Sequence, residues 1–155
     1  LGISTKNVHA YIMGEHGDSS FVPWEHCYAG CKSLKEIMID NHHELKDLDR
    51  IYTEVQQAAY EIINRKKATY YGIGLALTKL IKAILNDENG IYTVSTYLQG
   101  EYGQNDVYIG VPAIIGENGV REILNLRLTP EEQAKFEKSS QILKQMQEEI
   151  DSVIK

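Results

Sequence analysis

The chain of 155 residues is 43% hydrophobic and 25% charged, a composition typical of one soluble globular domain with its own core. Sixteen basic against 22 acidic residues leave a formal charge of −6, which argues against a nucleic-acid surface, where a basic patch is expected. No apolar run approaches the roughly 18 residues of a membrane span, and no signal-peptide pattern is present, so no membrane partner is expected. The chain starts at Leu1 without an initiator methionine, which suggests a fragment or a processed chain.

The first predicted element is a strand over residues 8–13, because side chains of two kinds alternate there with period two. One side is expected to carry Val8, Ala10 and Ile12, and the other His9, Tyr11 and Met13. The strand leads into the motif GEHGDS at residues 14–19 and places His16 at its C-terminal end. Gly14 and Gly17 allow a tight turn and leave room for a ligand to approach the imidazole.

His16 is a candidate acid–base catalyst, because a histidine can both give and take a proton near neutral pH. A structural role is the alternative, since a single histidine near a strand end is often structural. Asp18 is open in the same way, because Asp and Ser favour helix and turn caps for their local hydrogen bonds.

Cys27 and Cys31 are the only cysteines, and their four-residue spacing predicts that they share one face of a helix. With His26 and the pair His42-His43 nearby, a metal site is conceivable, but zinc sites usually need a second closely spaced ligand pair. We therefore predict no metal site and two reduced thiols, packed as small apolar residues in a cytoplasmic protein.

Helical signals follow. Pro23-Trp24 predicts a turn into a short helical piece, and the sequence SLKE at residues 33–36 fits a capping box at the start of a short helix. The polar residues 40–49 are expected to form a loop. From residue 51 the apolar residues recur with helical spacing up to about residue 67, which predicts a long helix.

A second long helix is predicted from Thr69 to about residue 86, before the stop signal Asn89-Gly90. The sequence Gly72-Ile73-Gly74 lies inside this helix and lacks both a third glycine and a preceding strand. It is therefore not a dinucleotide-binding fingerprint.

The last third predicts a sheet and a closing helix. Residues 93–98 and 107–113 are β-rich, and Asn118-Gly119 is a hairpin turn into residues 120–128. Thr129, Pro130 and Glu132 supply an N-cap, a first-turn proline and a capping glutamate for a helix over residues 130–153. Its residues expected to face the body are Phe136, Leu143, Met146, Ile150 and Val153. Long helices on a mostly antiparallel sheet make this an α+β fold.

Three ordered segments resemble one family. Residues 7–20, NVHAYIMGEHGDSS, followed by Pro23-Trp24, resemble the segment around the active-site histidine of L-lactate dehydrogenases, in the lactate/malate dehydrogenase family. Residues 67–74 resemble a second block, and residues 91–95 with 106–112 a third. The resemblance extends to the C-terminus and implies that residues 1–155 form the family's substrate-binding, catalytic C-terminal domain. The N-terminal dinucleotide-binding domain is then absent from this chain.

The resemblance implies the interconversion of pyruvate and L-lactate with NADH and NAD. His16 would give the proton in reduction and take it in oxidation, and its charge would polarise the substrate carbonyl. Thr69 matches a position that lines the substrate pocket, and Ile73, one helical turn later, a position that packs on the nicotinamide. Taken without the family, Thr69 is an ordinary N-cap and Ile73 a core residue.

Regulatory roles are also implied by the resemblance. His9 matches a position that binds fructose 1,6-bisphosphate across a subunit interface in bacterial allosteric members, although one imidazole without an arginine makes a weak anion site. Tyr60 matches a position sometimes assigned as a phosphotyrosine. A homotetramer in the cytoplasm, acting in glycolysis and in pyruvate fermentation to lactate, is the expected form of the whole enzyme.

Several family parts would precede the matched region and are not found in this sequence. They are the glycine-rich NAD fingerprint, the mobile loop with its arginine, and an Asp-x-x-Arg segment whose aspartate orients the histidine and whose arginine binds the carboxylate. We therefore predict that this polypeptide is inactive alone. The alternatives are half of a malate or 2-hydroxyisocaproate dehydrogenase, and a non-catalytic oligomerisation module.

Overall fold

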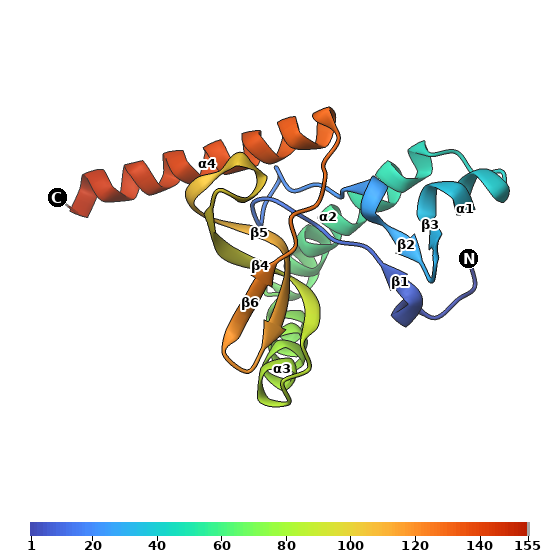
Figure 1. The fold of residues 1–155 in the computed structure, drawn as a ribbon, viewed down its shortest axis with the longest axis horizontal. Coiled ribbons are helices and arrows are strands. Elements are labelled where there is room, and N and C mark those ends of the chain that lie inside the picture. The colour runs from blue at the N-terminus through green and yellow to red at the C-terminus, as the bar shows by residue number, and fades with distance from the viewer. Residues whose placement is uncertain (155) are drawn as a thin grey trace.

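The computed structural model describes residues 1–154, and a three-stranded antiparallel sheet lies at its centre (Figure 1). Its strands are β4 (Gly90–Gln99), β5 (Asn105–Gly116) and β6 (Gly119–Ile123), in the order β4-β5-β6. The short 3₁₀ helix η3 (Glu101–Gly103) connects the first two strands. The hairpin and the α+β class are as predicted, and the register runs from Gly90 opposite Ile115.

Strand β5 supplies the centre of the main core. Val107, Ile109 and Val111 alternate along it and are buried, because successive side chains of a strand point to opposite faces. Strand β6 ends at Ile123, so the expectation of a strand up to residue 128 is wrong. Leu126 and Leu128, beyond the strand, still pack against this core without pairing in the ladder.

Helix α4 (Pro130–Ile154) crosses the sheet and is fixed by its first three turns. The predicted capping box is present: Glu132 N–H donates to Thr129 Oγ1 (3.2 Å), and Thr129 N–H donates to Glu132 Oε2 (2.9 Å). Phe136 is fully buried against Phe21 and Tyr102, with ring centroids 6.4 and 4.9 Å away.

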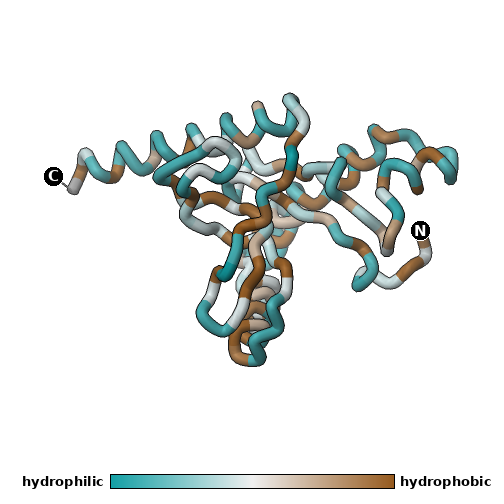
Figure 2. Tube along the Cα trace, viewed as in Figure 1, coloured by the Kyte–Doolittle hydropathy of each residue, from teal (hydrophilic) through white to brown (hydrophobic). Residues whose placement is uncertain are grey.

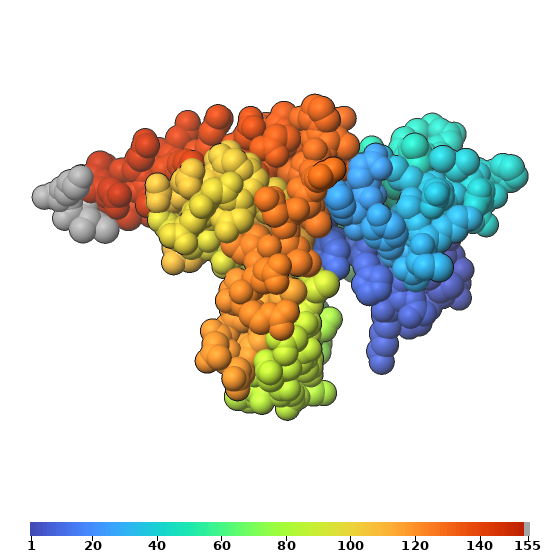
Figure 3. Space-filling model, viewed as in Figure 1, coloured from blue at the N-terminus to red at the C-terminus, as the bar shows by residue number. Residues whose placement is uncertain are grey.

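The second half of α4 extends beyond the sheet (Figures 1 and 3). Met146, Ile150 and Val153 were expected to face the body, but all three are exposed. Their helical spacing was read correctly, yet the sheet ends before it reaches them. The buried stripe instead continues from Phe136 through two serines, Ser139 and Ser140.

The N-terminal third forms a separate small sheet after the 3₁₀ helix η1 (Thr5–Asn7). Its antiparallel strands are β1 (Val8–His9), β2 (Tyr28–Ala29) and β3 (Lys32–Ser33). The predicted strand over residues 8–13 is therefore mostly wrong, because the chain leaves β2 after His9. Ala10 and Ile12 are exposed, while Met13 is buried on the opposite side, so the alternation holds only in part.

The 3₁₀ helix η2 (Trp24–His26) and helix α1 (Leu34–Asp40) lie where they were predicted. The capping box of α1 between Ser33 and Glu36 is complete. The two cysteines do not share a helix, which corrects the prediction from their spacing: Cys27 follows η2 and is buried, and Cys31 is exposed between β2 and β3. The expectation that both thiols are packed holds for Cys27 alone.

Helix α2 (Lys46–Lys66) begins inside the stretch expected to be a loop, and α3 (Tyr70–Leu85) follows it closely. Both are amphipathic as predicted, but their apolar residues are largely exposed. Figure 2 shows hydrophobic residues recurring along α3. The exposed large apolar residues of α3 are Tyr70, Tyr71, Ile73, Leu75, Leu77, Ile81 and Leu85. None of the helices described here combines the length and apolarity that a membrane crossing requires.

Candidate active site

The predicted catalytic histidine lies on a short loop, residues 14–20, that we call the His16 loop. Two pairs of backbone hydrogen bonds close its base. Met13 and Phe21 bond each other at 2.8 and 3.0 Å, and Gly14 and Gly110 at 2.9 and 3.0 Å. The second pair attaches the loop to strand β5 of the main sheet. The loop is therefore held by the sheet, although no continuous strand leads into it.

Gly14 is required at the start of this loop. Its φ of +101° lies in a region that side chains with a Cβ rarely adopt. A Cβ at Gly14 would also lie 2.7 Å from Ser139 Oγ of helix α4. The sequence predicted a tight turn at this glycine, and the structure adds a reason that the sequence does not contain, the close approach of a distant helix.

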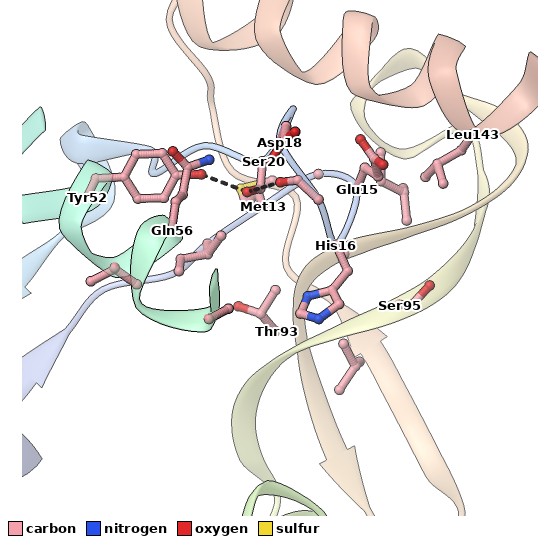
Figure 4. A pocket seen from close by; sticks show the side chains of 18 of the residues that line it. Met13, Glu15, His16, Asp18, Ser20, Tyr52, Gln56, Thr93, Ser95 and Leu143 are labelled. Carbon is pink, nitrogen blue, oxygen red and sulfur yellow. Dashed lines mark hydrogen bonds between the residues drawn. The ribbon is translucent and has the colours of Figure 1, made fainter. Parts of the chain in front are cut away.

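The His16 side chain is exposed and lines a cavity of about 770 Å³. Figure 4 shows the ring pointing toward strand β4, with Thr93 and Ser95 near it, and away from Asp18. Among the described residues, no hydrogen-bond partner of the ring is found. The ring is therefore free to meet a ligand, and a purely structural role in a closed interior is excluded.

Helix α2 forms the wall of the cavity opposite the sheet. Tyr52, Gln56 and Tyr60 line it at four-residue spacing, because residues four apart share a helix face. Tyr52 and Gln56 were not among the site residues predicted from the sequence. The signal in the sequence was the four-residue spacing of these three side chains, which places them on one helix face. It is easily overlooked, because the apolar residues of the same helix form the more conspicuous pattern.

Both tyrosines bond to the His16 loop. Tyr60 Oη donates to Asp18 Oδ1 at 3.1 Å, and this hydrogen bond raises the pKa of Tyr60. Tyr52 Oη and Ser20 Oγ lie 2.7 Å apart, and burial raises the pKa of Tyr52. Both phenols are therefore neutral donors or acceptors near neutral pH, and Asp18 contacts a side chain of α2 and does not cap a helix.

The charges around the cavity come from Glu15 and Asp18, and no lysine or arginine is among the described residues that line it. An anionic substrate such as a 2-oxo acid would need a cation to bind its carboxylate.

Thr69 and Ile73 lie at the start of α3. Thr69 occupies the N-cap position, but among the described residues its side chain accepts no capping hydrogen bond; its carbonyl accepts from Ile73 N–H at 3.4 Å. Ile73 is 55% exposed, so the interpretation of this residue as core is wrong. Neither residue lines the cavity at His16, and the structure does not bring them together with that ring.

The other candidates lie apart from His16. His9 is exposed on β1, opposite Tyr28 of β2. Within residues 1–154, no three His, Cys, Asp or Glu side chains are grouped to hold a metal ion. Burial raises the pKa of the Cys27 thiol to about 11, so this cysteine is an inert, protonated core residue near neutral pH.

The fold and site together define an α+β domain that presents one solvent-open histidine on a braced loop. The chain matches the lactate/malate dehydrogenase, alpha/beta C-terminal domain, over residues 1–154. It is 53% identical over 146 residues to L-lactate dehydrogenase 1 of Bacillus cereus, and 51% identical over 146 residues to L-lactate dehydrogenase 2 of Bacillus anthracis. Both alignments cover 94% of this chain and 46% of the relative. The chain thus spans about half the length of these curated relatives.

Solved structures agree with this match. The minor L-lactate dehydrogenase of Enterococcus mundtii, in its ligands-bound form, is 50% identical with a TM-score of 0.88, covering 93% of this chain and 46% of that one. The malate dehydrogenase of Aeropyrum pernix is 34% identical with a TM-score of 0.83, covering 94% and 47%. The lactate dehydrogenase of Eimeria maxima with NADH and oxamate is 27% identical with a TM-score of 0.91, covering 99% and 48%.

The chain belongs to the lactate/malate dehydrogenase family, and its fold is that of the family's C-terminal domain. The resemblance that the sequence suggested is thereby confirmed.

Proposed function

We propose that this chain is the catalytic half of an L-lactate dehydrogenase that interconverts pyruvate and L-lactate with NADH and NAD. The observation that carries the proposal is the position of His16, exposed at the tip of a rigidly closed loop and facing a cavity large enough for a small 2-oxo acid. High identity to L-lactate dehydrogenases across the same residues supports the choice of reaction.

His16 is the proton donor when the carbonyl is reduced and the base when the alcohol is oxidised. In its protonated form the imidazole places a positive charge and an N–H donor at one point, and both favour the negative charge that develops on the carbonyl oxygen. After transfer the ring is neutral and ready to accept a proton in the reverse direction. The backbone bonds at the loop base limit how far the ring can shift between these states.

Thr69 and Ile73 are the proposed contacts for substrate and cofactor on α3. When bound, the nicotinamide would supply the hydride. Ile73 fits such a group, because it presents an exposed, branched apolar side chain to which a flat ring can pack. Thr69 lies outside the cavity at His16, so its substrate contact is proposed from the family likeness; its hydroxyl caps no amide among the described residues. The carbonyl of Thr69 accepts from Ile73 N–H, which keeps the two residues one helical turn apart.

The site is completed by a dinucleotide-binding half that precedes this sequence in the whole enzyme. That half would supply the cation for the substrate carboxylate and the aspartate that orients His16. Support comes from the composition of the cavity wall, whose described charged side chains besides His16 are the acidic Glu15 and Asp18. The exposed apolar residues of α2 and α3 provide surface for this half or for other subunits.

The family likeness is the basis for proposing the location, assembly and regulation of the whole enzyme. The whole enzyme would be a cytoplasmic homotetramer that acts in glycolysis and pyruvate fermentation. His9, exposed on β1, would contribute to a fructose 1,6-bisphosphate site if an arginine joins it. Tyr60 stays a candidate phosphorylation site. A phosphate on its oxygen would remove the hydrogen bond to Asp18 and repel the Asp18 carboxylate.

The proposal is tested by joining residues 1–155 to the N-terminal half of L-lactate dehydrogenase 1 from Bacillus cereus and following NADH absorbance. The chain alone should give no pyruvate-dependent oxidation, and the chimera should turn over. Bound NADH, detected by fluorescence, serves as the control that the chimera is folded. A folded, NADH-binding chimera that does not reduce pyruvate would contradict the proposal, as would turnover by the chain alone.

A malate dehydrogenase half is the second candidate, and the likeness to the Aeropyrum pernix malate dehydrogenase favours it. Because the substrate-selecting loop is expected in the other half, the assay also compares pyruvate with oxaloacetate and 2-oxoisocaproate on chimeras with N-terminal halves from both enzyme types. An oligomerisation module without catalysis would self-associate in light scattering and give no turnover in any chimera.

A further inference from the structure

We propose that Ser139, a fully buried serine of helix α4, is the positioning residue that fixes the His16 loop for catalysis. Its Oγ lies 2.6 Å from Glu15 N and 3.0 Å from Ser19 Oγ, and so contacts both sides of the loop that carries His16. These residues are more than 100 positions apart in the sequence. The proposal rests on the function proposed above, because it gives Ser139 a role in the reaction of His16.

The hydrogen bonds around Ser139 have one consistent direction. Glu15 N–H can only donate, so Ser139 Oγ accepts there. The Glu15 carboxylate can only accept, so Ser19 Oγ–H donates to Glu15 Oε2. Ser19 Oγ is then left to accept the proton of Ser139. The three bonds form a closed ring that begins and ends at Glu15, and successive hydrogen bonds of this kind polarise one another.

This ring fixes Glu15 at two points, its backbone amide and its carboxylate. The carboxylate folds back over Gly17, where a Cβ would lie only 2.6 Å from Glu15 Oε1. The residues on both sides of His16 are therefore constrained by one network. The bonds between Gly14 and Gly110 hold the base of the loop, and within it Gly17 N–H donates to the Glu15 carbonyl at 2.9 Å. Ser139 adds the bond that holds the Glu15 amide from outside the loop.

Helix α4 is well suited to act as the support. Phe136, one turn before Ser139, is fully buried in the main core, and Leu143, one turn after it, lines the cavity at His16. Core packing thus fixes the position of α4, and the Ser139 hydroxyl holds the loop against this fixed helix. A misplacement of about 1 Å at a reacting group can reduce turnover about 100-fold, so a bond of this kind is able to affect the rate.

Ser140 provides a matched control. It is the next residue of the same helix and is equally buried, but its Oγ donates to Gln104 Oε1 at 2.8 Å, away from the His16 loop. Gln104 Oε1 keeps a second donor in Lys144 Nζ at 3.3 Å. Ser140→Ala therefore removes a buried serine hydroxyl from α4 without changing the contacts of Glu15 or Ser19.

The test compares Ser139→Ala, Ser140→Ala and Ser19→Ala in the pyruvate-reducing chimera. We expect Ser139→Ala to lower kcat by about 10- to 100-fold, with KM for NADH within about twofold of the starting enzyme. Ser140→Ala should keep kcat within about twofold, at a comparable loss of thermal stability. Ser19 is half-buried on the loop itself, so Ser19→Ala opens the same ring without removing a group from α4. It therefore reports on the network even if Ser139→Ala fails to fold, and we expect it to lower kcat about 3- to 10-fold.

Hydrogen exchange separates this inference from the proposed function. Amides of residues 14–20 should exchange at least about tenfold faster in Ser139→Ala than in Ser140→Ala, whatever the activity. Unchanged exchange in that loop, an unchanged kcat in Ser139→Ala and Ser19→Ala, or an equal loss of kcat in Ser140→Ala would each overturn the role of Ser139. Faster loop exchange together with turnover that does not need His16 would instead refute the proposed function and, with it, the catalytic part of this role.

Discussion

The His16 loop and the pair of helices α2 and α3 are stabilised in opposite ways. The loop has its backbone bonds closed at the base, its side chains bonded in a ring, and its support buried in the core. The outer faces of α2 and α3 carry apolar side chains that none of the described residues 1–154 covers; Leu75, for example, is 75% exposed. The position of the His16 loop is thus set by contacts within the chain, whereas the apolar faces of the two helices are left open by the residues that the structure describes.

The largest effect is expected in the core beneath the loop. Phe136→Ala removes a fully buried ring that contacts Phe21 and Tyr102, and should lower the free energy of unfolding by about 3–5 kcal/mol. Urea unfolding of the chain measures this loss. A change below about 1 kcal/mol would mean that α4 does not anchor the domain.

The loop base is the next most sensitive point. Gly14→Ala places a Cβ at a φ of +101° and 2.7 Å from Ser139 Oγ, and should cost about 2–4 kcal/mol. Gly30→Ala is the matched control, since Gly30 also has a positive φ, +63°, but open space around its Cβ position. It should cost only about 1 kcal/mol. Equal effects of the two changes, in the same unfolding measurement, would show that α4 does not press on the loop.

Alkaline pH should weaken the buried part of the molecule through Cys27. Its thiol has a pKa of about 11 when folded, against 9.0 for an ordinary cysteine thiol. Between these values the unfolded chain has lost a proton that the folded chain still holds, so stability falls as the pH rises from 9 to 11. Urea midpoints measured over this range should fall less steeply in Cys27→Ala. Cys31→Ser changes an exposed cysteine and should leave the slope as it is.

The smallest effect is expected on α3. Leu75→Gln replaces an exposed leucine by a residue of similar helix propensity, and should change the stability of the isolated chain by less than about 0.5 kcal/mol. It should also reduce self-association measured by light scattering. A loss above about 1.5 kcal/mol would show that this face is covered within the chain itself, which would remove the contrast between the two regions.

Local signals were sufficient for much of the fold. Some features depend only on residues a few positions apart, so they can be predicted directly from the sequence. They include the two capping boxes, Ser33 to Glu36 and Thr129 to Glu132, and the Asn118-Gly119 turn. The burial of a side chain is harder to predict, because it depends on whether another element packs against that side chain. The apolar spacing of α4 was read correctly, yet Val153 is 85% exposed since no sheet reaches it.

The candidate site was predictable only where the chain is continuous. His16 and its flanking glycines lie together in the sequence, whereas Tyr52 and Ser139 reach the loop from α2 and α4. A buried serine in an otherwise apolar stripe resembles any exposed polar residue until its partner is known. Positions 69 and 73 were assigned from family likeness alone, and their roles stay predictions.

The central claim, that His16 transfers the proton, is tested most directly by His16→Asn in the pyruvate-reducing chimera. Asparagine keeps a polar side chain of similar size but cannot exchange a proton near neutral pH. We predict that kcat falls by about 100- to 10,000-fold while the affinity for NADH, measured by fluorescence, stays within about twofold. A kcat within about threefold of the unaltered chimera would contradict the account.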